Sequence, residues 1–189
     1  MHRALRLTVD RSAIQSNWRW LQDRAGVPAG AAVKANGYGL GARETVQALH
    51  AVGCRDFFVS TWAEAEALGP LPVGTSLVVL HGAGPKDAEA ALASSARPCL
   101  NTVDQVARWK EVASGRECDV MIDTGINRLG LRPEEIGAVE GLAIHTLHSH
   151  LACSTRAASG RPATWCPPGS RRCSPSARRR GSCTTSRRE

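Results

Sequence analysis

The feature that most constrains the fold of this chain is a repeated alternation of short apolar runs with segments of helical pattern. Each apolar run has the length of a strand, ends in a polar residue and is followed by a helical segment. Strands that alternate with helices predict right-handed βαβ units and therefore a parallel sheet. The predicted strands are 31–33, 56–60, 76–80, 97–100, 118–122 and 142–147, and the predicted helices are 43–52, 62–68, 85–94, 102–112 and 133–139.

A separate N-terminal segment precedes this alternation. Residues 5–9 alternate between apolar and polar side chains, which is typical of a half-buried strand. Asp10 or Ser12 then has the residue type and place to cap an amphipathic helix that continues past Trp18. We therefore expect one strand and one helix before the first repeated unit.

Six strands of this kind fit either an open doubly wound sheet or most of a (β/α)₈ TIM-type barrel. Polar or ionisable residues follow nearly every strand, and parallel strands deliver such residues to the same rim of a barrel. An open sheet would gather them at one switch point instead. We therefore favour an α/β fold, an incomplete barrel with about six of its eight strands. The residues at the strand ends are Lys34, Ser60 or Thr61, His81, Asn101, Asp123, and His148 with His150.

The first of these strand ends carries a lysine in unusual surroundings. An apolar run over 29–33 stops at Lys34, and the next residues are rich in glycine and include Asn36 and Tyr38. Glycines allow a backbone to turn tightly or to approach a ligand closely, so this segment suits a ligand-binding loop. A lysine that extends along apolar surface into water at a strand end explains the same residues.

Two later motifs also follow strands. Residues 123–130 place Asp123 at a strand end and Arg128 in a turn-rich loop, where the arginine either contacts a ligand oxygen or lies on the surface while Asp123 caps a turn. His148 and His150 have the i, i+2 spacing that puts them on one face of a strand. No cysteine or carboxylate has a suitable spacing to complete a metal site, so we expect hydrogen-bonding histidines and no metal.

The basic charge of the chain is confined to its end. The net charge is +7, yet residues 1–153 hold 15 Lys and Arg against 16 Asp and Glu. Residues 154–189 hold 9 Arg, no Lys and one acid, and lack Leu, Ile, Val, Met and Phe. Such a segment buries too little apolar surface to fold, so we expect a disordered Arg/Ser/Pro-rich tail. Its composition is typical of a GC-rich gene read out of frame, and we expect a frameshift after about Cys153.

The chain lacks the marks of a secreted or membrane protein. No apolar stretch approaches the roughly 20 residues of a membrane helix. Asp10 lies where a signal peptide would have its apolar core. The seven cysteines show no CxxC pairs, which indicates neither a zinc site nor a disulfide framework. We therefore expect a cytoplasmic protein with no membrane partner.

Taken together, the motifs over 33–41, 123–130 and 148–153 resemble the pyridoxal-phosphate-binding barrel domain of bacterial alanine racemases, in the same order and with similar separation. The resemblance covers roughly residues 5–153. It implies that pyridoxal 5'-phosphate is the cofactor and that its binding residues include four positions of this chain. By this resemblance, Lys34 would bind the cofactor covalently, Tyr38 would help to hold its phosphate, Arg128 would contact its phenolic oxygen, and His150 would support an arginine beneath its pyridine nitrogen.

The same resemblance implies a function and a domain organisation. The family interconverts L-alanine and D-alanine, which supplies D-alanine for peptidoglycan, and acts as a homodimer. Lys34 would be the catalytic base on the D-alanine face, and a tyrosine from the partner's C-terminal β-domain would act on the other. We expect a partial barrel over 1–153, a tail over 154–189 and no C-terminal β-domain, so this form is expected to be truncated, inactive and doubtful as a dimer.

Two other functions fit parts of the sequence. A stand-alone pyridoxal-phosphate-binding barrel of the cofactor-homeostasis type would be complete without a β-domain but requires all eight strands, of which six are predicted. A protein that binds RNA through the arginines of 154–189 would explain the tail alone, and its RNA affinity would fall with added salt. The three motifs in order favour the racemase over both alternatives, and we expect no nucleic-acid partner.

Overall fold

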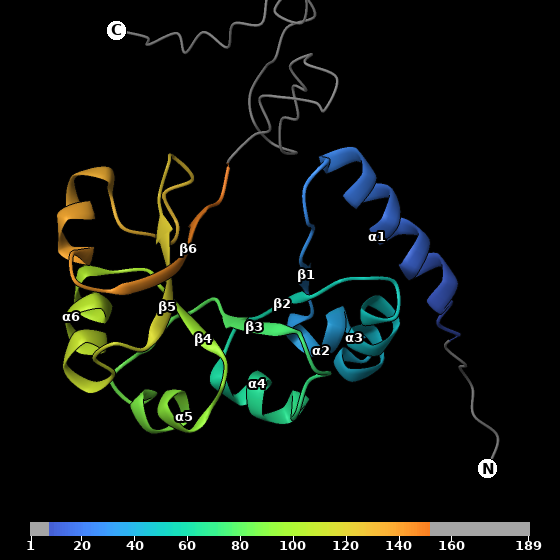
Figure 1. The fold of residues 1–189 in the computed structure, drawn as a ribbon, viewed down its shortest axis with the longest axis horizontal. Coiled ribbons are helices and arrows are strands. Elements are labelled where there is room, and N and C mark those ends of the chain that lie inside the picture. Colours follow the sequence, from blue (N-terminus) through green and yellow to red (C-terminus); the bar gives the residue numbers. More distant parts are fainter. Residues whose placement is uncertain (1–7, 152–189) are drawn as a thin grey trace, which may run out of the picture. The chain divides into compact units, whose positions relative to one another are not determined.

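The computed structural model describes residues 8–151, and those up to His150 form one compact unit. The chain alternates between helices and strands throughout this range (Figure 1). None of the helices within it has both the length and the apolar content needed to cross a membrane. The helices are α1 (Arg11–Ala25), α2 (Lys34–Tyr38), α3 (Ala42–His50), α4 (Trp62–Leu68), α5 (Ala88–Ala93), α6 (Val103–Val112) and the 3₁₀-helix η1 (Pro133–Val139).

Six parallel strands form the centre of the fold. Their order in space is their order in the sequence, from β1 to β6 (Figure 1). An open doubly wound sheet reverses its strand order at a switch point, whereas a barrel winds in one direction, so this order confirms the incomplete barrel. The strands are β1 (Ala31–Ala32), β2 (Asp56–Val59), β3 (Ser76–Val79), β4 (Arg97–Leu100), β5 (Glu117–Ile122) and β6 (Ala143–Ser149).

Local sequence signals account for the starts of α1, α4 and α6. Asp10 accepts hydrogen bonds from the backbone of Ser12 and Ala13 and caps α1, as predicted. Thr61 caps α4 within a capping box, and Thr102 caps α6 through the backbone N–H of Gln105. These caps satisfy N–H groups that have no partner inside the helix, which is why short helices can begin at these residues.

The element boundaries differ from the prediction mainly at strand and helix ends. The strand over 142–147 is shifted and extended to Ala143–Ser149, and the helix over 85–94 shortens to Ala88–Ala93. The segment over 133–139 is a 3₁₀-helix. Most of the strand predicted over 5–9, and the whole tail over 154–189, lie outside the described residues.

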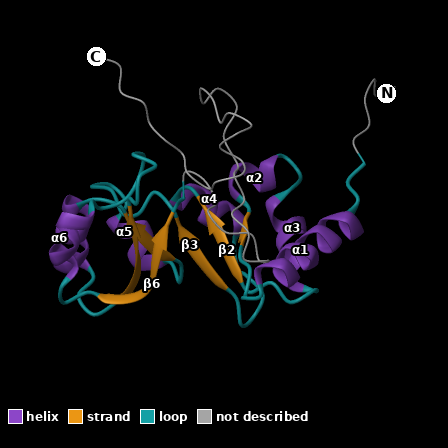
Figure 2. Ribbon diagram, turned by 90° about the horizontal axis from the view of Figure 1, so that it is seen from above, coloured by secondary structure: helices purple, strands orange, loops and turns teal. Residues whose placement is uncertain are grey.

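The sheet buries apolar side chains on both of its faces. The larger core lies between strands and helices, where Phe57, Val79 and Leu100 pack among residues such as Trp62 and Trp109. A smaller group, formed by Val78, Cys99, Met121 and Phe58, contains strand residues only. Figure 2 shows the strands grouped in the centre, with α6 at one end and α1 and α3 at the other.

Candidate functional site

Lys34 begins a left-handed turn at the end of β1. The N–H of the buried Val33 donates to the carbonyl of Phe58 at 2.8 Å, so the pairing with β2 continues up to the residue before the lysine. Ala35, Asn36, Gly37 and Tyr38 then all have positive φ angles, between 50° and 64°. The segment predicted as a loop is therefore a single left-handed turn, and the half-buried Lys34 is its first residue.

Left-handed backbone costs roughly 1–2 kcal/mol for each residue that has a Cβ, so several contacts must hold this turn. The N–H of Gly37 donates to the Val33 carbonyl at 2.8 Å, and the N–H of Gly41 donates to the Asn36 carbonyl at 2.9 Å. The Asn36 side chain accepts from the N–H of Ala42, at the start of α3, at 2.9 Å. Asparagine is among the residues that tolerate this conformation best.

The carboxylate of Glu64 joins this turn to the end of the next strand. Its Oε1 accepts from the N–H of Ala35 at 2.8 Å, and its Oε2 accepts from the N–H groups of Ser60 at 2.6 Å and Thr61 at 3.3 Å. Burial alone would raise the pKa of Glu64, but these backbone hydrogen bonds outweigh it and hold the pKa below its ordinary value. Glu64 is therefore ionised at neutral pH.

Sequence reasoning missed Glu64 as a residue of the site. The pattern from Thr61 to Glu64 is a capping-box signal and accounts for the local contact at the start of α4. The contact with Ala35 spans 29 residues of sequence, and no local pattern contains it.

Tyr38 lies in the same left-handed turn as Lys34. Its side chain is 62% exposed, and its own φ angle is 54°. The turn therefore presents an amine and a phenol on the same short segment. The conformation of Tyr38 requires support from its neighbours, because only glycine adopts it without strain.

The loop after β5 is folded back by Asp123. Its Oδ1 accepts from the N–H groups of Gly125 at 2.9 Å and Asn127 at 3.1 Å. These bonds hold the pKa of Asp123 below its ordinary value and cap the turn, while the ligand contact of Arg128 stays a prediction. The N–H of Asp123 also donates to the Leu131 carbonyl at 2.8 Å, which returns the chain to β5.

Arg128 and His150 meet at the end of β6. Nη2 of Arg128 lies 3.3 Å from Nδ1 of His150, and both residues are exposed. The hydroxyl groups of Thr124 and Ser149 are 2.5 Å apart and join the same two segments. The structure therefore brings two of the four predicted cofactor residues together, and Lys34 and Tyr38 lie in the left-handed turn at the end of β1.

A buried polar network lies beneath this end of the sheet. Asp119 on β5 is 1% exposed and accepts from Arg97 Nε at 3.1 Å, while its Oδ2 lies 2.8 Å from Nε2 of His148. His148 therefore makes a hydrogen bond, as predicted, and its ring packs edge-on against Phe58. Burial would raise the pKa of Asp119, but the contacts with His148 and Arg97 outweigh it and lower the pKa. The sequence motifs indicated neither Asp119 nor Arg97.

The three cysteines of the described range are buried thiols with raised pKa values. Cys54, Cys99 and Cys118 are free and buried. Burial, with the charge of Asp119 nearby, raises the pKa of Cys99 to about 12 and that of Cys118 to about 11. Within residues 8–151, no three His, Cys, Asp or Glu side chains gather in a group that could hold a metal ion.

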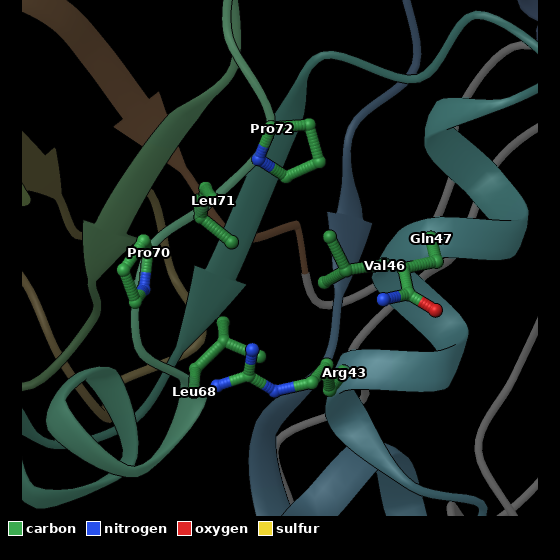
Figure 3. A pocket seen from close by; sticks show the side chains of 7 residues that line it. All are labelled: Arg43, Val46, Gln47, Leu68, Pro70, Leu71 and Pro72. Atoms are coloured by element: carbon green, nitrogen blue, oxygen red, sulfur yellow. The ribbon is translucent and has the colours of Figure 1, made fainter.

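One hollow of about 230 Å³ lies between α3 and the segment that follows α4 (Figure 3). The close-up shows Arg43 and Val46 from α3 opposite Leu68 and the prolines that follow it. None of the four predicted cofactor residues lines this hollow. It results from the packing of helices on the outside of the sheet. Its lining is Arg43, Val46, Gln47, Leu68, Pro70, Leu71 and Pro72.

The singly wound parallel sheet, with a lysine at the end of β1 and polar side chains at later strand ends, defines a protein of the (β/α)-barrel class whose predicted site residues lie at the carboxyl rim. The family described as "Alanine racemase, N-terminal domain" matches residues 9–164 of this chain. The chain belongs to this family, which confirms the resemblance inferred from its three motifs.

Individual relatives agree with this assignment. The chain is similar to the alanine racemases of Cereibacter sphaeroides (strain ATCC 17029), with 40% identity over 155 residues, and of Rhodospirillum rubrum, with 41% identity over 162 residues. Each match covers 78% of this chain and 44% or 43% of the relative. The chain thus spans less than half the length of these curated relatives.

Solved structures give the same result. The alanine racemase of Bartonella henselae, described with covalently bound pyridoxal phosphate, is 30% identical with a TM-score of 0.68, over 80% of this chain and 46% of that one. These findings favour the racemase family over the stand-alone cofactor carrier and the RNA-binding protein.

Proposed function

We propose that this chain carries the cofactor-binding portion of a pyridoxal-phosphate-dependent alanine racemase, with Lys34 as the residue that bonds to the cofactor. The observation that carries the proposal is the anchored turn at the carboxyl end of β1, whose first residue is a lysine. The Bartonella henselae relative, described with covalently bound pyridoxal phosphate, supports the choice of cofactor.

The side chains present fit the chemistry of this cofactor. A primary amine is the group that bonds to its aldehyde, and Lys34 supplies one at the strand end where barrel sites lie. Tyr38 offers a hydroxyl donor to a phosphate oxygen from the same turn. The guanidinium of Arg128, beside His150 at 3.3 Å, offers donors to a phenolic oxygen.

Pyridoxal phosphate, when bound, withdraws electrons from the α-carbon of an amino acid, so that its α-proton becomes acidic. Lys34 would then exchange that proton at Nζ on the face of the D-isomer. Racemisation requires a second base on the opposite face, and Tyr38 is the only tyrosine among the 189 residues. As the family resemblance implies, we assign Tyr38 to phosphate binding and the second base to a tyrosine of the partner subunit.

The remaining features follow from the same proposal. The substrate is alanine, the location is the cytoplasm, and the whole enzyme of this family pairs as a homodimer. We assign residues 1–153 to the cofactor-binding part of the barrel. Residues 154–189 do not take part in cofactor binding or racemisation.

Cofactor bonding can be measured directly on the chain. Incubation with pyridoxal phosphate, followed by borohydride reduction and peptide mass mapping, is expected to label Lys34 far above Lys86 and Lys110, the other two lysines of the sequence. The two surface lysines serve as internal controls for unspecific labelling. Equal labelling of all three lysines would refute the assignment of Lys34.

Racemisation by the purified chain is expected to be absent, even with added pyridoxal phosphate, because the sequence holds no tyrosine besides Tyr38 to act as the second base. The conversion of L-alanine into D-alanine can be followed with a D-amino-acid oxidase coupled assay. A full-length relative serves as the positive control. Measurable conversion would contradict the assignment of the second base.

A further inference from the structure

We propose that Glu64 is a positioning residue for Lys34, whose carboxylate fixes the peptide that follows the lysine and thereby directs the amine. The inference deepens the proposed function and rests on it for the role of Lys34. Its structural basis is independent of any cofactor, because the contacts involved lie entirely within the chain.

Glu64 does more than cap its own helix. A residue at the third position of a helix with a capping box needs to accept only from the N-cap N–H, here that of Thr61. That contact is the longest of the three, at 3.3 Å, whereas Ser60 and Ala35 donate at 2.6 and 2.8 Å. Oε2 accepts from the two N–H groups that precede α4, and Oε1 accepts from the lysine turn.

The contact with Ala35 controls the geometry of the lysine. The N–H of Ala35 belongs to the peptide group that joins Lys34 to Ala35, so its orientation sets the ψ angle of Lys34. Ala35 itself has a φ of 50°, which a residue with a Cβ keeps only where its surroundings hold it. Without Glu64, that peptide is free to rotate towards an unstrained conformation, and the amine moves with it.

A carboxylate is required for this arrangement. Its two oxygens accept three backbone N–H groups at once, and charge-assisted hydrogen bonds are the stronger kind. Glutamine has the same length but only one acceptor oxygen. Its NH₂ group would face a backbone N–H at the place of the second oxygen, and two donors cannot form a hydrogen bond. Glu64→Gln therefore cannot hold both segments at once.

The test compares Glu64→Gln with two control variants, one at the N-cap of α4 and one within α4. Thr61→Ala removes the side-chain cap of α4 but keeps the backbone donor of Thr61, and Glu66→Gln removes an exposed charge of α4. Two quantities are measured in each variant of the full chain. The first is the exchange rate of the Ala35 amide without cofactor, and the second is borohydride-trapped pyridoxal phosphate on Lys34, relative to Lys86 and Lys110.

Glu64→Gln is expected to raise the Ala35 exchange rate about tenfold and to lower trapping on Lys34 by a similar factor, as the loss of one charge-assisted hydrogen bond implies. Thr61→Ala is expected to lower the melting temperature yet leave trapping on Lys34 unchanged. Glu66→Gln should change neither quantity. Unchanged trapping in a folded Glu64→Gln variant would overturn the proposal, even if the Ala35 amide exchanged faster.

The two proposals fail in different ways. If wild-type Lys34 is not trapped above the other lysines, the proposed function fails, and the Ala35 exchange rate still shows whether Glu64 fixes the peptide. If Glu64→Gln does not fold, Glu64→Asp replaces it, because the shorter carboxylate stays near Ser60 and Thr61 but loses its reach to Ala35. Full trapping on Lys34 in Glu64→Asp would overturn the positioning role.

Discussion

Replacing Asp119 by asparagine is expected to lower the free energy of unfolding by about 3–5 kcal/mol, although the volume of the side chain stays the same. Asp119 is 1% exposed, and the side chain of Arg97 that donates to it is 15% exposed. The substitution leaves that mostly buried guanidinium without its counter-charge, and it turns an acceptor of His148 into a group that also donates. Urea denaturation at pH 7 measures the loss.

The stabilisation by Asp119 also depends on pH. Because the folded pKa lies below the unfolded one, the stabilisation is fully present above the unfolded pKa and is lost as the pH falls through the folded pKa. The wild-type chain is therefore expected to lose more stability on acidification than Asp119→Asn does. A parallel decline of the two would show that Asp119 does not supply this dependence.

Asp23→Asn is the matched control for this substitution. Asp23 lies on α1 and is exposed, so the same chemical change is expected to alter the free energy of unfolding by no more than about 0.5 kcal/mol. An equal loss in both variants would contradict the role of the buried network.

Replacing Gly130 by alanine is expected to cost about 3 kcal/mol and to open the loop that carries Arg128. Gly130 has a φ of +123°, and an added Cβ would lie 2.6 Å from the backbone N of Asp123 and 2.9 Å from the carbonyl carbon of Ile122. Backbone strain and overpacking each contribute about 1–3 kcal/mol. Because the atoms in the way are backbone, the loop must separate from β5 to relieve the contact.

Two measurements follow this change. Urea denaturation gives the lost stability, and the exchange rate of the Asp123 amide reports the hydrogen bond to Leu131 that closes the loop, 2.8 Å long in the structure. Gly125→Ala is the matched control, since Gly125 has a φ of +124° in the same loop but no atom near the added Cβ. It is expected to cost only about 1 kcal/mol of strain. Equal losses in the two variants would show that the contact with Asp123 is unimportant.

Much of the fold was predictable because its signals are local. The six apolar runs and the caps at Asp10 and Thr102 depend on neighbours a few residues away, and strand β4 and helix α4 begin and end where the patterns predicted. The fold class was predictable for a different reason. Polar residues after nearly every strand indicated a common rim, and the strand order in the structure agrees with it.

The site was predictable only in part. The motif around Lys34 predicted a ligand-binding loop, but the left-handed conformation of this segment depends on hydrogen bonds from Gly41 and Ala42 and on Glu64. The capping box accounts for Glu64 at the start of α4, and it gives no sign of the hydrogen bond that Glu64 accepts from Ala35. Asp119 lies between apolar residues of β5, and its partners on β4 and β6 are 22 and 29 residues away.

The sequence by itself determined the element order, the parallel class of the sheet, the family and the lysine at the end of the first strand. These depend on residue type and spacing, which act over a few positions along the chain. Only the tertiary structure decided which carboxylates hold the lysine turn and the interior of the sheet. Glu64 and Asp119 acquire those roles because parallel strands, each followed by a helix, bring residues more than 20 positions apart within hydrogen-bonding distance.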